Sequence, residues 1–319
     1  GIHHITLGPF AAATGYNLLH QHVYSDCVFH NAHFIRGGTG NLAETLLKFA
    51  KSVGGEIRTC STVQSIEVAN GVCSGVTLES GETITAAKVV SGLDPTHTFI
   101  RLVGSAELNP SFFTQVRNIK NRGSTARIHF ALNSLPGIKG VSQDQMESVF
   151  SISPSIEYIE RAADAAKYGC IAEDPYVEFT IPSVINPNFA PEGKHVLSAT
   201  VQYAPYHLRN QTWSEELKVQ LKNNVVRILE NYIPGFSDQI KSSAVFSPMD
   251  LEDKFGLTEG NLNHGEMTLN QFFFMRPTMS SAQYKSPIEN LYLCGSGTHP
   301  GGGIHGTNGF NAAHEILKQ

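Results

Sequence analysis

The sequence lacks any cysteine pattern that would define a metal site or a disulfide framework. It has an odd number of cysteines and no C-x-x-C pair; they are Cys27, Cys60, Cys73, Cys170 and Cys294. An odd, scattered set argues against a disulfide-stabilised secreted fold and favours a reducing compartment. We therefore expect a cytoplasmic protein.

Long apolar runs and an excess of basic residues are also missing. No apolar run approaches the roughly 18 residues that a membrane-spanning helix needs. The first residues, GIHHITLGPFAAATG, lack the basic flank and apolar core of a signal peptide. The net charge of -5 comes from interspersed charges and offers no basic surface for nucleic acid. We expect a soluble protein without nucleic-acid binding, and peripheral membrane contact stays open.

A complete dinucleotide-binding fingerprint is absent as well. Such a site needs a strand, then G-x-G-x-x-G, then a helix, with an acidic residue about 20 residues further on. The segment GGTGNLAE at 37–44 lacks the last glycine and does not follow a buried strand. It is explained equally well as a turn in which Asn41 caps a helix. Any cofactor domain in this sequence is therefore incomplete.

The periodicities that are present predict a mixed α/β protein. Residues 16–24 predict a short strand, and residues 37–53 predict an amphipathic helix that glycines end. Residues 56–92 are rich in β-branched residues and predict three or four short strands, with turns at Asn70-Gly71 and Ser80-Gly81. Further strands are predicted over 124–132, 176–184 and 194–204, and a helix over 214–232.

The end of the chain is the most informative segment. It reads NLYLCGSGTHPGGGIHGTNGFNAAHEILKQ and predicts a strand over 291–294, a glycine-rich loop and a helix over 311–318. A helix N-terminus carries free N–H groups and a partial positive charge, and glycines let the backbone approach a flat ring closely. The segment favours an anion-binding or cofactor-binding turn, with a merely flexible loop as the alternative.

Three segments together resemble the phytoene desaturase-like flavoproteins. They are residues 34–95, the motif NQFFFMRP at 270–277, and residues 286–317. Their order is similar to the C-terminal portion of that family, most closely the branch of the pyridine nucleotide-disulphide oxidoreductase domain-containing proteins. The resemblance implies a glutathione reductase-like FAD-binding domain, of the amine oxidase and phytoene desaturase type, interleaved with a substrate domain that contains a mixed β-sheet. It assigns 37–100 and 286–319 to the FAD domain, and 1–36 and 101–285 to the substrate domain.

The resemblance also implies which residues contact FAD. Val63 takes the position where the main chain meets the adenine, and Gly92 follows a strand that runs back toward the diphosphate. Gly295 and Ser296 take the strand end near the ribityl chain, where Ser296 replaces the aspartate of many relatives. The residues that lead into the last helix, whose N-terminal amides would face the flavin pyrimidine, are Gly303, Gly306, Thr307 and Asn308.

Several other residues allow two interpretations. His20 and His22 alternate, and His299 and His305 flank the glycine loop, but no H-x-x-x-H helix or Cys/His quartet accompanies them, so no metal site is predicted. We interpret His299 as a loop residue that forms a hydrogen bond near the flavin or lines the substrate cavity.

The residues of the motif NQFFFMRP also have two interpretations, one structural and one functional. Arg276, after an apolar strand, is interpreted as a structural residue paired with a buried carboxylate, with substrate orientation as the alternative. Phe272, Phe273 and Phe274 are interpreted as sheet core, with a substrate-contacting cluster as the alternative. No side chain is a convincing acid or base, so the catalytic residues are unknown.

The resemblance implies an FAD-dependent oxidoreductase that transfers hydride from an apolar, unsaturated small molecule to flavin. Because the first FAD-binding segment of the family would precede residue 1, we expect this chain to be a C-terminal portion or a subunit, inactive alone and binding FAD weakly or not at all. The expected partner is an N-terminal FAD-domain chain or a second copy. Two alternatives remain: a non-catalytic binding or scaffold protein without a functional cofactor site, and, less well supported, a nicotinamide-dependent dehydrogenase.

Overall fold

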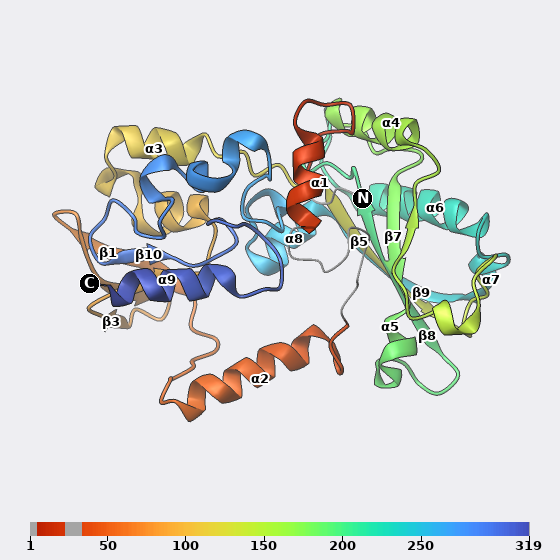
Figure 1. Cartoon of the computed structure of the whole chain (residues 1–319), viewed down its shortest axis with the longest axis horizontal. Coiled ribbons are helices and arrows are strands. Elements are labelled where there is room, and N and C mark those ends of the chain that lie inside the picture. The colour runs from red at the N-terminus through yellow and green to blue at the C-terminus, as the bar shows by residue number, and fades with distance from the viewer. Residues whose placement is uncertain (1–4, 23–33, 319) are drawn as a thin grey trace. The chain divides into compact units, whose positions relative to one another are not determined.

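The computed structural model describes residues 5–22 and 34–318 (Figure 1). The chain forms two compact units, each made of two stretches that are distant in sequence. Unit 1 takes its residues from Gly1–Ile57 and Ser124–Asp250, and unit 2 from Arg58–Gly123 and Leu251–Gln319. The resemblance divided the chain differently, into stretches that bind FAD and stretches that bind substrate. That division stays a prediction.

Unit 1 is built on a five-stranded antiparallel sheet in the order β6-β7-β8-β5-β9. Its strands are β5 (Thr125–Leu132), β6 (Phe150–Ile152), β7 (Tyr176–Thr180), β8 (His195–Gln202) and β9 (Ile240–Phe246). Alternate residues of β5 and β8, among them Ile128, Phe130 and Leu197, face one core. The strands predicted over 124–132, 176–184 and 194–204 are confirmed, although the last part of the second forms a short helix, α5 (Pro182–Ile185).

Helix α6 (Glu215–Glu230) covers the core face of this sheet. It begins after Ser214, whose hydroxyl accepts a hydrogen bond from the Leu217 amide at 3.4 Å. Leu221, Val225 and Leu229 recur at helical spacing and are buried in the same core as the strands. The helix predicted over 214–232 is therefore confirmed.

Two further helices of unit 1 differ from the sequence predictions. Residues 14–22 form α1 (Thr14–His22), so the strand predicted over 16–24 is wrong for the residues that the structure describes. This segment has leucine, glutamine and asparagine in place of a β-branched run, and nothing in it opposes a helix. Helix α4 (Ile156–Lys167) escaped prediction because its buried face consists of alanines, Ala162, Ala163 and Ala166, rather than large apolar residues. A further short helix in this unit is α7 (Phe236–Gln239).

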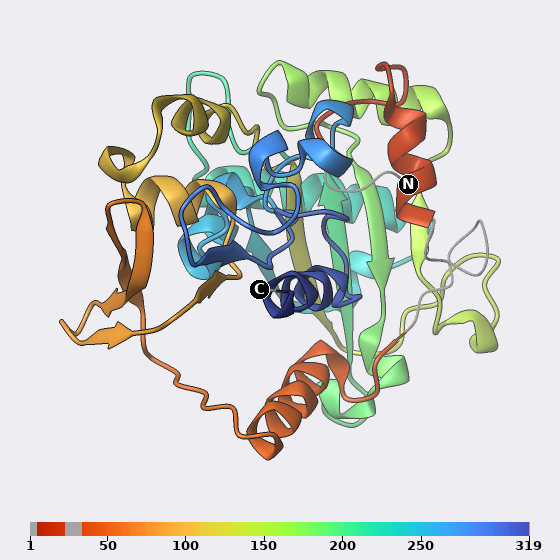
Figure 2. The same cartoon turned by 60° about the vertical axis from the view of Figure 1, so that its left-hand side comes forward.

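Helix α2 (Gly38–Ser52) is the predicted amphipathic helix, but none of its described side chains is buried. Its start is held by the Gly37 amide, which donates to Asn186 Oδ1 at 2.7 Å. Phe49 on its apolar stripe is 66% exposed, and the helix stands away from the five-stranded sheet (Figures 1 and 2). An amphipathic stripe normally faces a core, so α2 presents an apolar surface without cover in the described part of the chain.

Unit 2 contains a three-stranded antiparallel sheet and a separate parallel strand pair. The sheet comprises β1 (Val63–Ala69), β2 (Val72–Leu78) and β3 (Thr83–Thr85), and the pair comprises β4 (Val89–Ser91) and β10 (Leu291–Leu293). Asn70 and Gly71 both have positive φ, 52° and 78°, as a tight two-residue hairpin turn requires. The strands predicted over 56–92 are confirmed.

Two helical segments of unit 2 enclose a core with the strands. They are a π-helical segment (His97–Val103) and α3 (Pro110–Arg117). The unit also contains α9 (Thr307–Leu317), and α8 (Pro248–Phe255) spans the unit boundary at residue 250. Phe99 and Phe112 pack edge to face with ring centroids 4.8 Å apart, beside Leu291 and Leu293 of β10. Within residues 5–22 and 34–318, no helix has the length and apolar character to cross a membrane.

Candidate functional site

The ends of β4 and β10 meet at one edge of unit 2. The two strands run parallel, and the Cys294 amide donates to the Ser91 carbonyl at 2.9 Å. Gly92 follows one strand directly, and Gly295 and Ser296 follow the other after one residue. Ligands of α/β proteins bind outside the carboxyl ends of parallel strands. The structure thus brings three predicted site residues together, whereas Val63 begins β1 in the other sheet of the same unit.

Some glycines of the C-terminal loop are required by packing alone. A Cβ at Gly295 would overlap the Gly92 carbonyl, and one at Gly302 would overlap the Asn263 side chain. At Gly297 it would lie 2.6 Å from Pro95 Cδ. These residues let the loop fold closely against its own unit, which is a structural reason for glycine independent of any ligand.

Gly306 differs from these packing glycines. Its φ is 66°, and a Cβ built on it would meet no atom within 4 Å. Gly303 also has positive φ, 137°, and its Cβ would meet only the side chain of His305. Both glycines are exposed, so the backbone of this part of the loop is accessible without a covering side chain.

Helix α9 starts immediately after Gly306, earlier than the predicted start at residue 311. No side chain of the described residues caps its N-terminus in the usual way, although the Thr307 amide donates to His305 Nδ1 at 3.1 Å. First-turn amides such as that of Gly309 have no carbonyl partner within the helix. This end of α9 therefore fits an electron-rich group, as expected for a flavin pyrimidine.

Asn308 has a positioning role. Its side chain is buried, and its Nδ2 donates to the carbonyls of Gly295 at 3.2 Å and Thr298 at 3.0 Å. These bonds connect the first turn of α9 to the loop after β10. Asn308 thus fixes the N-terminus of α9 relative to the loop after β10, so that both can contact the same ligand.

Arg276 is fully buried and binds backbone carbonyls instead of the predicted carboxylate. Its guanidinium donates to the carbonyls of Ser296 at 2.8 Å, Gly265 at 3.2 Å and Gln271 at 3.2 Å, and also to that of Asn263. Burial lowers the pKa of Arg276 to about 10, which leaves it charged at neutral pH. The structural interpretation is confirmed, but the preceding residues form a short 3-10 helix (Phe273–Met275), so the predicted strand is wrong.

His264 lies beside the strand ends and was not singled out by the sequence. A Cβ at Gly295 would come within 3.1 Å of His264 Nδ1, and this buried nitrogen has no hydrogen-bond partner among the described residues. Burial lowers the pKa of His264; nearby Asp94 opposes this shift, and Arg276 adds to it. Its φ of 55° is uncommon for a residue with a side chain. An unpaired buried nitrogen at this edge fits a site that a ligand completes.

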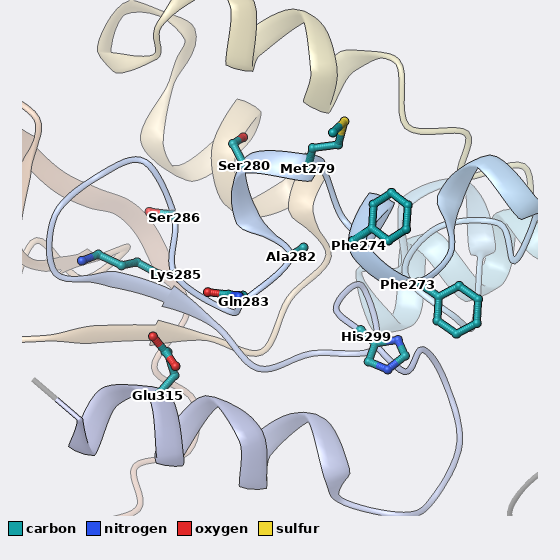
Figure 3. A pocket seen from close by; sticks show the side chains of 10 residues that line it. All are labelled: Phe273, Phe274, Met279, Ser280, Ala282, Gln283, Lys285, Ser286, His299 and Glu315. Atoms are coloured by element: carbon teal, nitrogen blue, oxygen red, sulfur yellow. The ribbon is translucent and has the colours of Figure 1, made fainter.

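A hollow of about 520 Å³ lies in unit 2 between the 273–286 segment and α9 (Figure 3). Phe273, Phe274 and Met279 form its apolar side, with exposures of 42%, 67% and 68%, whereas Phe272 is buried. The sheet-core prediction is therefore wrong for Phe273 and Phe274, because the segment coils and turns them outward.

His299 also lines this hollow, and its predicted contact with flavin or substrate stays a prediction. Its ring lies 5.7 Å from that of Phe273, and its buried Nδ1 has no partner in the described part of the chain. Burial, and then Arg276, lower the pKa of His299, which favours the neutral imidazole.

No group of three potential metal ligands lies close together among residues 5–22 and 34–318. His20 and His22 lie on helix α1 rather than on a strand.

Comparison with known proteins assigns the chain to a family. Residues 11–317 match the flavin containing amine oxidoreductases. The chain is 34% identical over 321 residues to pyridine nucleotide-disulfide oxidoreductase domain-containing protein 2 of Rattus norvegicus, covering 97% of this chain and 55% of that protein. It is 28% identical to the lycopene-forming phytoene desaturase of Pantoea ananas, covering 94% and 58%.

Solved structures show the same fold at low sequence identity. An oxidoreductase from Methanosarcina mazei has a TM-score of 0.51 at 16% identity, over 89% of this chain and 55% of that one. A putrescine oxidase variant has a TM-score of 0.51 at 11% identity, over 89% and 53%.

The chain belongs to the flavin-containing amine oxidoreductase family, whose cofactor is FAD. Within it, the predicted resemblance to phytoene desaturases and to the pyridine nucleotide-disulfide oxidoreductase domain-containing branch is confirmed, as is the mixed α/β fold. The chain spans just over half the length of these curated relatives.

Proposed function

We propose that this chain supplies the flavin-facing part of an FAD-dependent oxidoreductase. The observation that carries the proposal is the open N-terminus of α9 after the exposed Gly303 and Gly306, which Asn308 connects to the loop after β10. Bound FAD would supply the capacity to accept a hydride. The helix end would stabilise negative charge on the ring, and Arg276 would hold the Ser296 backbone in place.

The proposed substrate is an apolar, unsaturated small molecule. The apolar side of the hollow, formed by Phe273, Phe274 and Met279, supports this class, as does the similarity to a phytoene desaturase. His299, kept neutral by burial, adds a hydrogen-bonding group without adding a charge. Such a surface would orient an apolar molecule and exclude water from it.

The proposed partner is the N-terminal cofactor-binding segment, on this chain's complete protein or on a separate chain. Leu46 and Phe49 of α2 are 59% and 66% exposed, and Val53, directly after the helix, is 68% exposed. A parallel pair such as β4 and β10 is normally part of a larger sheet with both faces covered. A second copy of this chain is the alternative cover for α2.

The first test is flavin content. We expect the chain purified alone to be colourless, because the diphosphate-binding glycines are absent from it, and to become yellow when it is co-purified with a segment that carries G-x-G-x-x-G. Absorbance spectroscopy with quantified FAD measures this. Stoichiometric flavin on the chain alone would contradict the division of the site, and a colourless complex would favour the scaffold alternative.

A further inference from the structure

The hollow of unit 2 has two unlike ends (Figure 3). Phe273 and His299 lie at one end, whereas the charged residues Lys285 and Glu315 lie at the other. Glu315 forms an ion pair with Lys318 at 3.1 Å. A ligand group bound beside Phe273 would therefore have His299, rather than a charged side chain, as its polar neighbour.

The ring of His299 has one buried nitrogen and one that can face the hollow. Nδ1 is buried and has no hydrogen-bond partner among the described residues. His299 is partly exposed and lines the hollow, so Nε2 is the nitrogen through which the ring can contact a ligand. Buried N–H groups without an acceptor are rarer in proteins than acceptors with unused lone pairs. The proton of the neutral ring therefore belongs on Nε2, which makes this atom a hydrogen-bond donor.

The surroundings of His299 keep its ring neutral. Burial, followed by the charge of Arg276, lowers the pKa of His299. A second proton would also place an N–H at the buried Nδ1, where no acceptor lies in the part of the chain that the structure describes. His299 thus offers the hollow one donor and no charge. A carbonyl oxygen, which accepts hydrogen bonds and carries no donor, is the complementary ligand group.

His299 is held in place before any ligand binds. Its backbone carbonyl accepts hydrogen bonds from Tyr284 Oη at 2.8 Å and from Asn308 Nδ2 at 3.4 Å. Asn311 of α9 donates in turn to Tyr284 Oη at 2.7 Å. The imidazole also lies against Phe273, with ring centroids 5.7 Å apart. Because these contacts order His299 in advance, a ligand loses little affinity to ordering it.

We propose that this hollow takes an apolar, unsaturated molecule that carries one carbonyl group, and that His299 Nε2 donates a hydrogen bond to the carbonyl oxygen. The carbon skeleton would lie along Phe273, Phe274 and Met279. This assignment rests on the proposed function, which places the substrate in the hollow. Binding of the carbonyl compound needs no flavin, so its failure is distinguishable from a failure to bind FAD.

The test measures binding of two molecules to the full chain by equilibrium dialysis. One is β-ionone, an apolar unsaturated ketone, and the other is its isostere with a methylene group in place of the ketone oxygen. Because the isostere is itself more apolar, the informative quantity is the ratio of the two dissociation constants. This ratio should favour the ketone about threefold to tenfold more in the wild type than in His299→Phe, as expected for one hydrogen bond between neutral groups.

Two further variants separate the donor from the rest of the side chain. His299→Gln keeps an N–H donor and should restore part of the ketone preference that His299→Phe loses. His314→Phe, at an exposed histidine of α9 in the same unit, should retain the wild-type ratio. A ratio in His299→Gln no higher than in His299→Phe would count against the donor role.

Infrared difference spectroscopy gives an independent readout. The carbonyl stretch of bound β-ionone should have a lower frequency in the wild type than in His299→Phe, because a hydrogen bond weakens the C=O bond. Equal ratios in these two proteins, equal carbonyl frequencies, or binding of neither molecule would overturn the proposal. If circular dichroism shows that His299→Phe does not fold, the wild-type frequency is compared with that of β-ionone in hexane, and equality would again overturn it.

Discussion

Replacing Arg276 with methionine should destabilise unit 2 severely. The change removes a fully buried cation from four backbone carbonyls, including those of Ser296 and Gly265, and methionine offers them no donor. Because each buried acceptor left unpaired is costly, we expect a loss of about 3–5 kcal/mol in the free energy of unfolding. Urea denaturation followed by circular dichroism measures the change.

Arg117→Met is the matched control for that experiment. Arg117 is an exposed arginine on α3 of the same unit, placed over the Phe113 ring at 5.6 Å. Its loss should cost no more than about 1 kcal/mol. Similar losses at the two arginines would show that the carbonyls around Arg276 do not depend on its charge.

Gly306→Val should weaken FAD binding by the chain combined with the proposed cofactor-binding segment. The loss should be larger than the backbone strain of the substitution explains. A side chain at Gly306 would project from the start of α9 into space where no protein atom lies within 4 Å, which is where we place the flavin. We expect the dissociation constant for FAD to rise at least about tenfold, since close approach of the ring to the backbone is lost. Fluorescence titration of the apoprotein with FAD measures it.

Gly256 provides an unusually close control for Gly306. Its φ is 67° against 66°, a Cβ there would also meet nothing within 4 Å, and it follows the end of α8 in the same unit. Gly256→Val therefore introduces the same left-handed strain, about 1–2 kcal/mol, away from the proposed ring. Equal effects of the two substitutions on FAD affinity would mean that the loop is structural only.

The segments with a regular hydrophobic pattern were predictable because residues close in the sequence determine their secondary structure. The β1–β2 hairpin is specified by Asn70-Gly71 between β-branched runs, and α6 by Ser214 followed by apolar residues at helical spacing. α4 was missed because alanines gave its buried face little hydrophobic contrast, and the start of α9 was obscured because glycine precedes it. The extent of both helices therefore depends on tertiary packing.

The candidate site was predictable in position but not in detail. The resemblance placed Gly92 and Gly295 each after a strand, and the structure shows that these two strands pair in parallel. The packing role of Gly295 depends on the carbonyl of a residue distant in sequence, and that of Arg276 on carbonyls from separate loops. The left-handed backbone of His264 and the outward turn of Phe274 are likewise set by tertiary structure.

Hydrogen exchange with and without FAD tests the central claim most directly. In the chain combined with the proposed cofactor-binding segment, FAD should slow the exchange of amides in 303–310, at the loop end and first turn of α9, while α6 of unit 1 should not change. The account predicts protection at 303–310 that Gly306→Val reduces and Gly256→Val preserves. Bound FAD that protects other segments but leaves 303–310 exchanging at the same rate would contradict it.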